Sequence, residues 1–316
     1  RWSGRPFEKI KELDDHLDPA WVIPDSARKA SNEIIARIQS LDLASRVCRQ
    51  TSYSELSRKA WSDRALDRSE GDDETMETFA TQGEQLLPTS LPRGKHTGDA
   101  LHLALEELLG MENPDTVHAS AVEKIARQYL ERNRVLTPMT QQSDRLAAIQ
   151  NAAGIIQAAV RQPYELSGKG SVTISGLPKS CRIPEMEFLL GKSRDWVHGY
   201  MDLVFRIQKS RAKHPWQYFV LDWKSDSLTT FEPGTIETCM KERHYELQAK
   251  IYCHALDRYL KGLLGKDYNP EENLGGALYV FLRSFENPNP DGNVHSYFRA
   301  AEPDKDDAFV NTAVGL

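Results

Sequence analysis

The 316-residue chain has little cysteine, no long apolar run and no excess of basic residues. Its four cysteines, Cys48, Cys181, Cys239 and Cys253, are far apart and form no CxxC pair. This spacing disfavours a zinc site or an iron–sulfur cluster and suits a reducing compartment. No apolar run approaches the length of a membrane span, and no N-terminal signal pattern is visible. We therefore expect a cytoplasmic protein without a membrane partner.

The net charge of −6 at pH 7 restricts how the chain could act on nucleic acid. A free-standing DNA-binding protein usually carries a basic face, because phosphate neutralisation provides most of the non-specific affinity. An acidic domain that acts on DNA needs local basic patches, or a partner that delivers the strand. The first residue is Arg1 rather than Met, so we expect a fragment of a longer protein.

Composition divides the chain into three parts. The first, 1–66, contains one amphipathic helix, predicted at about Ser26–Leu41 from its apolar spacing. The second, 67–90, is rich in Gly, Ser, Thr and acids, which predicts a flexible acidic linker. The third, 91–316, has the regular apolar patterns of a folded domain.

Within 91–316 the apolar pattern changes from helical to strand-like and back. We predict helices from about Thr97, at about Asp115–Asn133 and Gln141–Val160, strands at Cys181–Leu190, Tyr200–Gln208 and Trp216–Trp223, a helix at about Thr235–Leu263, and a strand at Gly276–Leu282. This order predicts an α/β fold with a small central mixed sheet flanked by helices, or an α+β fold with a helical cap.

Two acids lie in otherwise apolar predicted strands. Asp202 lies in GYMDLVF, and Asp222 lies in YFVLDWKS. A lone buried carboxylate is costly unless it is paired or binds a metal ion, and either acid alone fits a structural role. Lys224 follows two residues after Asp222, so strand alternation places both on one face. Two carboxylates that hold Mg²⁺ beside a lysine that orients water or stabilises developing charge would suit phosphodiester hydrolysis.

Three further residues are candidates for the same site. Glu185 and Glu187 alternate in PEMEFLL, so both share one face, and either could reach a metal ion or be an exposed edge acid. His102 lies in the leucine-rich helix GDALHLALEELL. On helical position alone His102 fits a packed or surface residue better than a ligand, because imidazole suits Mg²⁺ less well than carboxylate.

Two further groups of residues are candidates for contact with a DNA strand. Tyr245, Gln248 and Tyr252 share one face of the predicted helix in HYELQAKIY, where they could form core hydrogen bonds or contact a strand. The segment Gln208–His214 is basic and suits a hairpin. It is either a solvated turn or a phosphate contact, and its candidates are Lys209, Arg211 and Lys213.

Six ordered blocks of the chain resemble the RecB-like branch of the PD-(D/E)XK nucleases. They are LPRGKHTGDALHLALEEL, PEMEFLL, HGYMDLVFR, YFVLDWKSD, HYELQAKIYCHALDRYL and LGGALYVFLR. TSYSEL, at 51–56, is similar to the connector that precedes the nuclease domain of that family. The resemblance covers about 51–283 and implies a restriction-endonuclease-like core at 91–316, preceded by a connector at 1–66.

The resemblance also implies roles for single residues. Asp202, Asp222, His102 and the main-chain carbonyl of Trp223 match the metal ligands of the family. Asp202, Asp222, Lys224 and, with a less defined role, Glu187 match its catalytic positions. Gln248 and Tyr252 match the QxxxY pair that contacts DNA, and Tyr245 lies on the same helical face. The implied cofactor is Mg²⁺, and oxygen-rich sites also take Mn²⁺.

The resemblance implies a deoxyribonuclease of the bacterial cytoplasm that takes part in double-strand-break repair and recombination. No Walker A motif is present, so we expect the helicase itself to be absent from this fragment. The resemblance implies a covalently linked helicase domain and partner subunits that deliver single-stranded ends. Two other hypotheses stay open. One is a retired nuclease fold that only binds DNA or a partner, and the other is a stand-alone deoxyribonuclease.

Overall fold

The structure is a computed structural model that describes residues 49–52, 91–166, 170–192, 195–209, 215–286 and 294–314. All of these residues belong to one unit, Arg49–Leu316. The predicted helix at 26–41 and the predicted linker at 67–90 lie outside the described residues.

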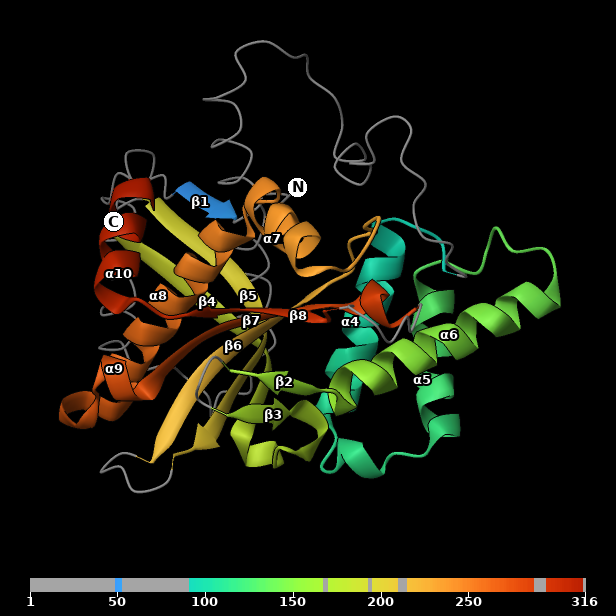
Figure 1. The fold of residues 1–316 in the computed structure, drawn as a ribbon, viewed down its shortest axis with the longest axis horizontal. Helices are drawn as coiled ribbons and strands as arrows, with labels where there is room; N and C mark the ends of the chain where they lie inside the picture. The colour runs from blue at the N-terminus through green and yellow to red at the C-terminus, as the bar shows by residue number, and fades with distance from the viewer. Residues whose placement is uncertain are drawn as a thin grey trace, which may run out of the picture. The chain divides into compact units, whose positions relative to one another are not determined.

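A mixed sheet forms the centre of the described part of the chain (Figure 1). Its main strands have the order β4-β5-β6-β7-β8. β6 and β7 are parallel, whereas the other neighbours in this order are antiparallel. The strands are β4 (Arg182–Lys192), β5 (Asp195–Gln208), β6 (Trp216–Lys224), β7 (Leu274–Phe281) and β8 (Ser296–Ala300).

A sixth strand, β1 (Arg49–Ser52), pairs in parallel with the beginning of β5. β5 therefore has three partners. β4 pairs along most of its length, β1 pairs with residues 195–198, and β6 pairs with residues 203–208. β1 lies within the segment that the sequence predicts to be a connector, so part of that segment belongs to the sheet.

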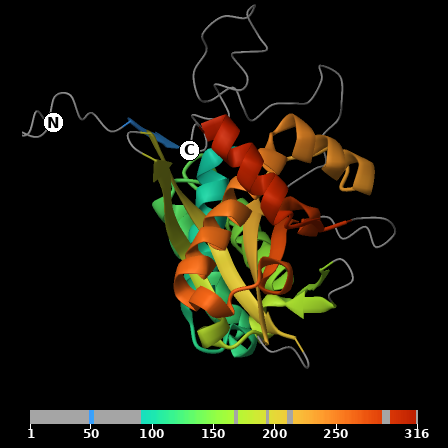
Figure 2. The ribbon, with the colours of Figure 1, turned by 90° about the vertical axis from the view of Figure 1, so that its left-hand side faces the viewer.

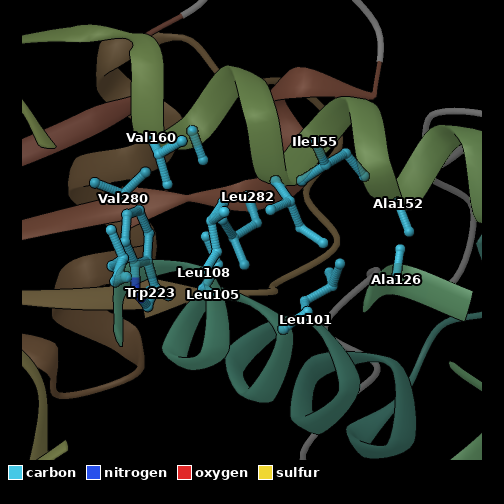
Figure 3. Close-up of a cluster of buried hydrophobic side chains, with 14 of the residues drawn as sticks. Leu101, Leu105, Leu108, Ala126, Ala152, Ile155, Val160, Trp223, Val280 and Leu282 are labelled. Atoms are coloured by element: carbon cyan, nitrogen blue, oxygen red, sulfur yellow. The ribbon is translucent and has the colours of Figure 1, made fainter. Parts of the chain in front are cut away.

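Three helices pack together against one face of the sheet (Figure 1). They are α4 (Lys95–Gly110), α5 (Ala119–Arg132) and α6 (Gln142–Arg161). Figure 3 shows the core that they share with β6 and β7. Leu105 and Leu108 of α4 lie beside Trp223, Leu101 of α4 points toward α6, and Ile155 of α6 points toward α4. The spacing of the α4 leucines places them on one helical face, and that face is buried here as the sequence predicts.

The other face of the sheet carries α8 (Tyr245–Leu264). Ile251, Ala255 and Leu256 of α8 pack against Val204 and Val220 of the sheet. α10 (Pro303–Val314) packs against α8 (Figure 2). The predicted α/β class, with a mixed sheet flanked by helices and preceded by helices, is therefore confirmed.

The helix predicted at about 235–263 is two helices in the structure, α7 (Pro233–Glu242) and α8. His244 separates them with a φ of 55°, a left-handed conformation that residues other than glycine adopt rarely. The apolar spacing continues through this break, so periodicity alone misses it. No helix in the described residues is both long enough and apolar enough to span a bilayer.

Candidate active site

Asp222 and Lys224 lie at the end of β6 and face α8. Leu221 and Trp223 lie in the core with α4 and α6. Because side chains alternate along a strand, Asp222 and Lys224 face the opposite side. Asp222 is 4% exposed and Lys224 is 9% exposed. The Nζ atom of Lys224 lies 2.7 Å from Oδ2 of Asp222, so the predicted pair shares one face and is in contact.

Asp202 reaches the same place from β5. The β5–β6 ladder has its last pair at Leu203 and Leu221. Immediately beyond that pair, Oδ2 of Asp202 accepts a hydrogen bond of 2.7 Å from the main-chain N–H of Trp223. The two acids of the predicted site therefore meet where adjacent strands separate, and a main-chain donor holds one of them.

His102 approaches Asp202 from α4. Its Nδ1 atom lies 3.3 Å from Oδ2 of Asp202, and its side chain is 30% exposed. Burial by itself would lower the pKa of His102, but the charge and hydrogen bond of Asp202 outweigh this and raise the pKa to about 9. In turn, burial would raise the pKa of Asp202, but His102 and the Trp223 N–H lower it. The helix thus places an imidazole against one of the two acids, and this contact favours the protonated imidazole.

Asp222 has the opposite electrostatic character. Burial raises its pKa to about 6 despite the attraction of Lys224, and the charge of Asp202 adds to this effect. Oδ2 of Asp222 is buried, and its contact is the ion pair with Lys224. A buried carboxylate beside a second carboxylate is suited to bind a cation.

A third acid, Glu185 of β4, stands at the position opposite Asp202. The ladder pairs Pro184 with Leu203 and Met186 with Met201, and it skips the pair between them. Glu185 has a φ of 48°, which interrupts the extended backbone there. Burial raises its pKa to about 7, with further contributions from Asp202 and others. Glu185 is therefore the acid of β4 that interacts with the site.

Glu187, the acid of β4 that the sequence favours, stands opposite Tyr200 instead. It is exposed, and its Oε1 atom lies 2.7 Å from Nε2 of His198. The hydroxyl of Tyr200 donates to the same oxygen at 3.4 Å. The structure thus brings Glu185 rather than Glu187 next to Asp202, and the catalytic role of Glu187 stays a prediction.

The donor types of this site fit a hard divalent cation, but their present arrangement does not enclose one. Among the described residues, no three His, Cys, Asp or Glu side chains are close enough to hold a metal ion. Asp202 is paired with His102, and Asp222 is paired with Lys224. A metal ion would have to replace these partners. The Trp223 side chain is buried in the core, and the ligand role of its carbonyl stays a prediction.

A chain of hydrogen bonds from α8 holds Lys224. Nζ of Lys224 donates to Oε1 of Gln248 at 2.8 Å, and Nε2 of Gln248 donates to the hydroxyl of Tyr252 at 2.9 Å. The Tyr252 hydroxyl donates in turn to the carbonyl oxygen of Tyr200 at 2.9 Å. Gln248 and Tyr252 are buried, so in this structure they position the lysine. Their contact with DNA stays a prediction.

Tyr245 holds the same lysine from another side. Nζ of Lys224 lies 3.8 Å from the centre of the Tyr245 ring, a cation–π contact. The Tyr245 hydroxyl donates to both carboxylate oxygens of Asp226, at 3.1 and 3.0 Å. Lys224 is therefore fixed by an anion, an amide and an aromatic ring.

The predicted basic hairpin is described only at its beginning. Nζ of Lys209 donates to the main-chain carbonyl of Glu272 at 3.1 Å. Arg211 and Lys213 lie outside the described residues. Their predicted contact with phosphate stays a prediction.

Comparison with known proteins relates this chain to one group. No protein-family model matches it. The subunit RecB of the RecBCD enzyme from Escherichia coli K12 is 32% identical over 123 residues, which are 38% of this chain and 10% of that subunit. The chain is a distant homologue of RecB subunits over part of its length. The RecB subunits of Buchnera aphidicola and Haemophilus influenzae are 25% and 26% identical over 65% and 61% of the chain. The chain spans 18% and 16% of their lengths.

This RecB-related region has a cavity beside Lys224 that the sequence did not indicate. Its volume is about 240 Å³. Residues before α4, after β6 and at the end of α7 contribute to its wall, so segments distant in sequence meet there. The sequence signal for it is KSDS, which begins at the last residue of β6, because Asp226 follows Lys224 by the same two residues that separate Lys224 from Asp222. The lining residues that were missed are Arg93, Ser225, Asp226, Ser227 and Arg243.

Proposed function

We propose that the unit Arg49–Leu316 is a Mg²⁺-dependent deoxyribonuclease that hydrolyses phosphodiester bonds. The observation that carries this proposal is the meeting of Asp222 and Lys224, at the end of β6, with Asp202, in the middle of the adjacent strand β5. The distant relation to RecB subunits supports it. Oxygen ligands suit Mg²⁺, and Mn²⁺ is the expected substitute.

The proposed roles follow from charge and position. Asp202 and Asp222 would hold the metal ion, and Glu185 is a further carboxylate that interacts with both. When bound, the metal ion polarises the phosphate and lowers the pKa of its water. Lys224, held by Gln248 and Tyr245, donates to a phosphate oxygen and offsets charge that develops there. His102 must lose its proton to act as a ligand, so metal affinity should rise with pH.

We further propose that a helicase in the same larger protein, together with partner subunits, delivers the DNA strand. The chain carries a net charge of −6, which repels a polyanion at a distance. Covalent linkage to a strand-feeding domain would raise the local concentration of DNA and offset this repulsion. The bacterial cytoplasm is the corresponding location.

The matched test compares two buried aspartates that each face a lysine. Asp222→Asn removes the proposed ligand, whereas Asp257→Asn changes a buried acid of α8 whose Oδ2 lies 2.7 Å from Nζ of Lys261. The whole chain is incubated with end-labelled single-stranded and double-stranded DNA in Mg²⁺, in Mn²⁺ and in chelator. We expect Asp222→Asn to lose about a thousandfold or more of the cleavage rate. Asp257→Asn should cleave like the wild type after correction for the folded fraction.

One observation favours a second function, a retired nuclease fold that binds DNA without cutting it. Both proposed ligands are paired with cations of the protein itself. The same experiment separates the two functions. DNA binding with no metal-dependent cleavage by the folded wild type would favour the retired fold and reject the nuclease. Equal cleavage by the wild type and Asp222→Asn would instead reject Asp222 as a ligand of the reaction.

A further inference from the structure

The cavity beside Lys224 is built from segments that lie close to the proposed catalytic groups. Its wall includes His102, Trp223 and Lys224. The segment after β6 passes the start of α4 (Figure 1), where a Cβ atom at Gly98 would lie 2.6 Å from Oγ of Ser225. This close approach lets residues before α4 and after β6 face one cavity. The side chains that bear on its chemistry are Arg93, Lys224, Ser225, Asp226, Ser227 and Arg243.

The charges of this wall differ in how far they are neutralised. Lys224 is paired with Asp222. Nε of Arg243 lies 3.7 Å from Oδ1 of Asp226, and both side chains are largely buried. Arg93 is exposed and forms no ion pair among the described residues. Within the described part of the chain, the cavity therefore has an arginine without a paired acid, beside a buried cation and two serine hydroxyls.

This combination suits a phosphate group. Arginine matches the oxygens of phosphate with two parallel N–H donors, and serine hydroxyls donate to the remaining oxygens. A volume of about 240 Å³ is below the roughly 300–1,000 Å³ of typical small-molecule pockets. It fits one phosphate with part of its sugar. Asp226 does not oppose the anion strongly, because Arg243 and the Tyr245 hydroxyl both contact it.

We infer that this cavity is a phosphate subsite that binds the DNA phosphate next to the one being cut, with Arg93, Ser225 and Ser227 as donors. The inference rests on the proposed function for the identity of the strand. The phosphate is either internal to the strand or the terminal phosphate of its end. In both cases the subsite fixes the register of the strand relative to Asp202 and Asp222.

The test measures binding without cleavage. The fluorescence anisotropy of a labelled single-stranded oligonucleotide is followed in chelator, at several salt concentrations, with the whole chain. The variants are Arg93→Gln and a control, Arg145→Gln, which removes an exposed arginine of α6. We expect Arg93→Gln to bind about tenfold more weakly and to reduce the salt slope by about 0.7, the value for one phosphate of a single strand. Arg145→Gln should bind like the wild type.

The outcomes separate the subsite from the nuclease proposal. Equal binding by Arg93→Gln and Arg145→Gln, whether unchanged or equally weakened, overturns the subsite even if the wild type cleaves DNA. A selective loss in Arg93→Gln supports the subsite even if no cleavage is found. Oligonucleotides with a 5′-phosphate, a 3′-phosphate or neither identify its source. A preference for one phosphorylated end that Arg93→Gln abolishes assigns a terminal phosphate, and a selective loss without such a preference assigns an internal one.

Discussion

The two faces of β6 differ in chemistry although both are buried. On one face Leu221 and Trp223 lie in a core formed with α4 and α6. On the other face Asp222 and Lys224 meet the polar side of α8, where Oε1 of Gln248 accepts a hydrogen bond from Nζ of Lys224. Apolar burial stabilises a fold, whereas buried charges cost free energy even when they are paired. The comparison indicates that the face of β6 covered by α4 and α6 contributes mainly to stability, whereas the end of the face covered by α8 holds the proposed catalytic groups.

The largest expected effect on stability is on the face of β6 that packs against α4 and α6. Leu105→Ala removes a side chain of α4 with no exposed surface and should destabilise the fold by about 3–5 kcal/mol, because a cavity remains. Urea unfolding measures this loss, and Leu146→Ala, at an exposed leucine of α6, is the control with an expected change within about 0.5 kcal/mol. Equal losses in the two variants would contradict the assignment of stability to this core.

A smaller loss of stability with a specific loss of turnover is expected on the α8 face. Tyr252→Phe leaves the amide of Gln248 and the carbonyl of Tyr200 without this hydroxyl, at a cost of about 1–3 kcal/mol. Lys224 then loses its fixed position, so kcat of DNA cleavage should fall with little change in KM. Tyr268→Phe removes a comparable hydroxyl that donates to Asp257, and it should lower stability but leave kcat unchanged. A similar fall in kcat in both variants would mean that the relay has no specific role.

Two glycines test how tightly α4 packs beside the site. Gly154→Ala on α6 has open space around the new Cβ and should stabilise by about 0.5–1 kcal/mol through helix propensity. Gly98→Ala should give no such gain, because its Cβ would meet the hydroxyl of Ser225 at 2.6 Å. The double variant Gly98→Ala with Ser225→Ala should recover the gain, as measured by thermal unfolding. A full gain in stability in the single Gly98→Ala variant would show that Ser225 can move away from α4 at little cost.

The smallest expected effect concerns a polar residue of α8 away from the site. Burial lowers the pKa of His254 below 6.5, although Asp307 at 3.0 Å acts in the other direction. The folded state favours neutral His254, so this contribution to stability is present above pH 6.5 and is lost as the pH falls through the lowered pKa. His254→Gln should therefore flatten the decline in unfolding free energy between pH 7 and pH 5. An unchanged slope would show that His254 does not titrate there.

Much of the arrangement on β6 could be predicted because it depends on local geometry. Strand alternation alone places Asp222 and Lys224 together, and helical spacing alone places Gln248 and Tyr252 one turn apart. The contact between His102 and Asp202 joins residues 100 positions apart, a separation that no local period reports. Only the family resemblance indicated it.

Other features could not be predicted because they depend on backbone irregularities. Alternation treats Glu185 and Glu187 alike, but the positive φ of Glu185 changes the ladder and brings only that acid to Asp202. The left-handed His244 divides a helix whose apolar pattern continues. β8 was not predicted, because a strand of five half-buried or exposed residues has no clear apolar alternation. α10 was not predicted either.

The pairing of β1 with β5 has a consequence for how this protein is cut into pieces for study. A shortened chain that starts at the predicted domain boundary, residue 91, would lose β1 and leave residues 195–198 of β5 without their parallel neighbour. Unpaired main-chain donors and acceptors at a strand edge invite pairing with another molecule. Such a piece should self-associate through this edge, so oligomers seen with it would report the truncation rather than the native protein.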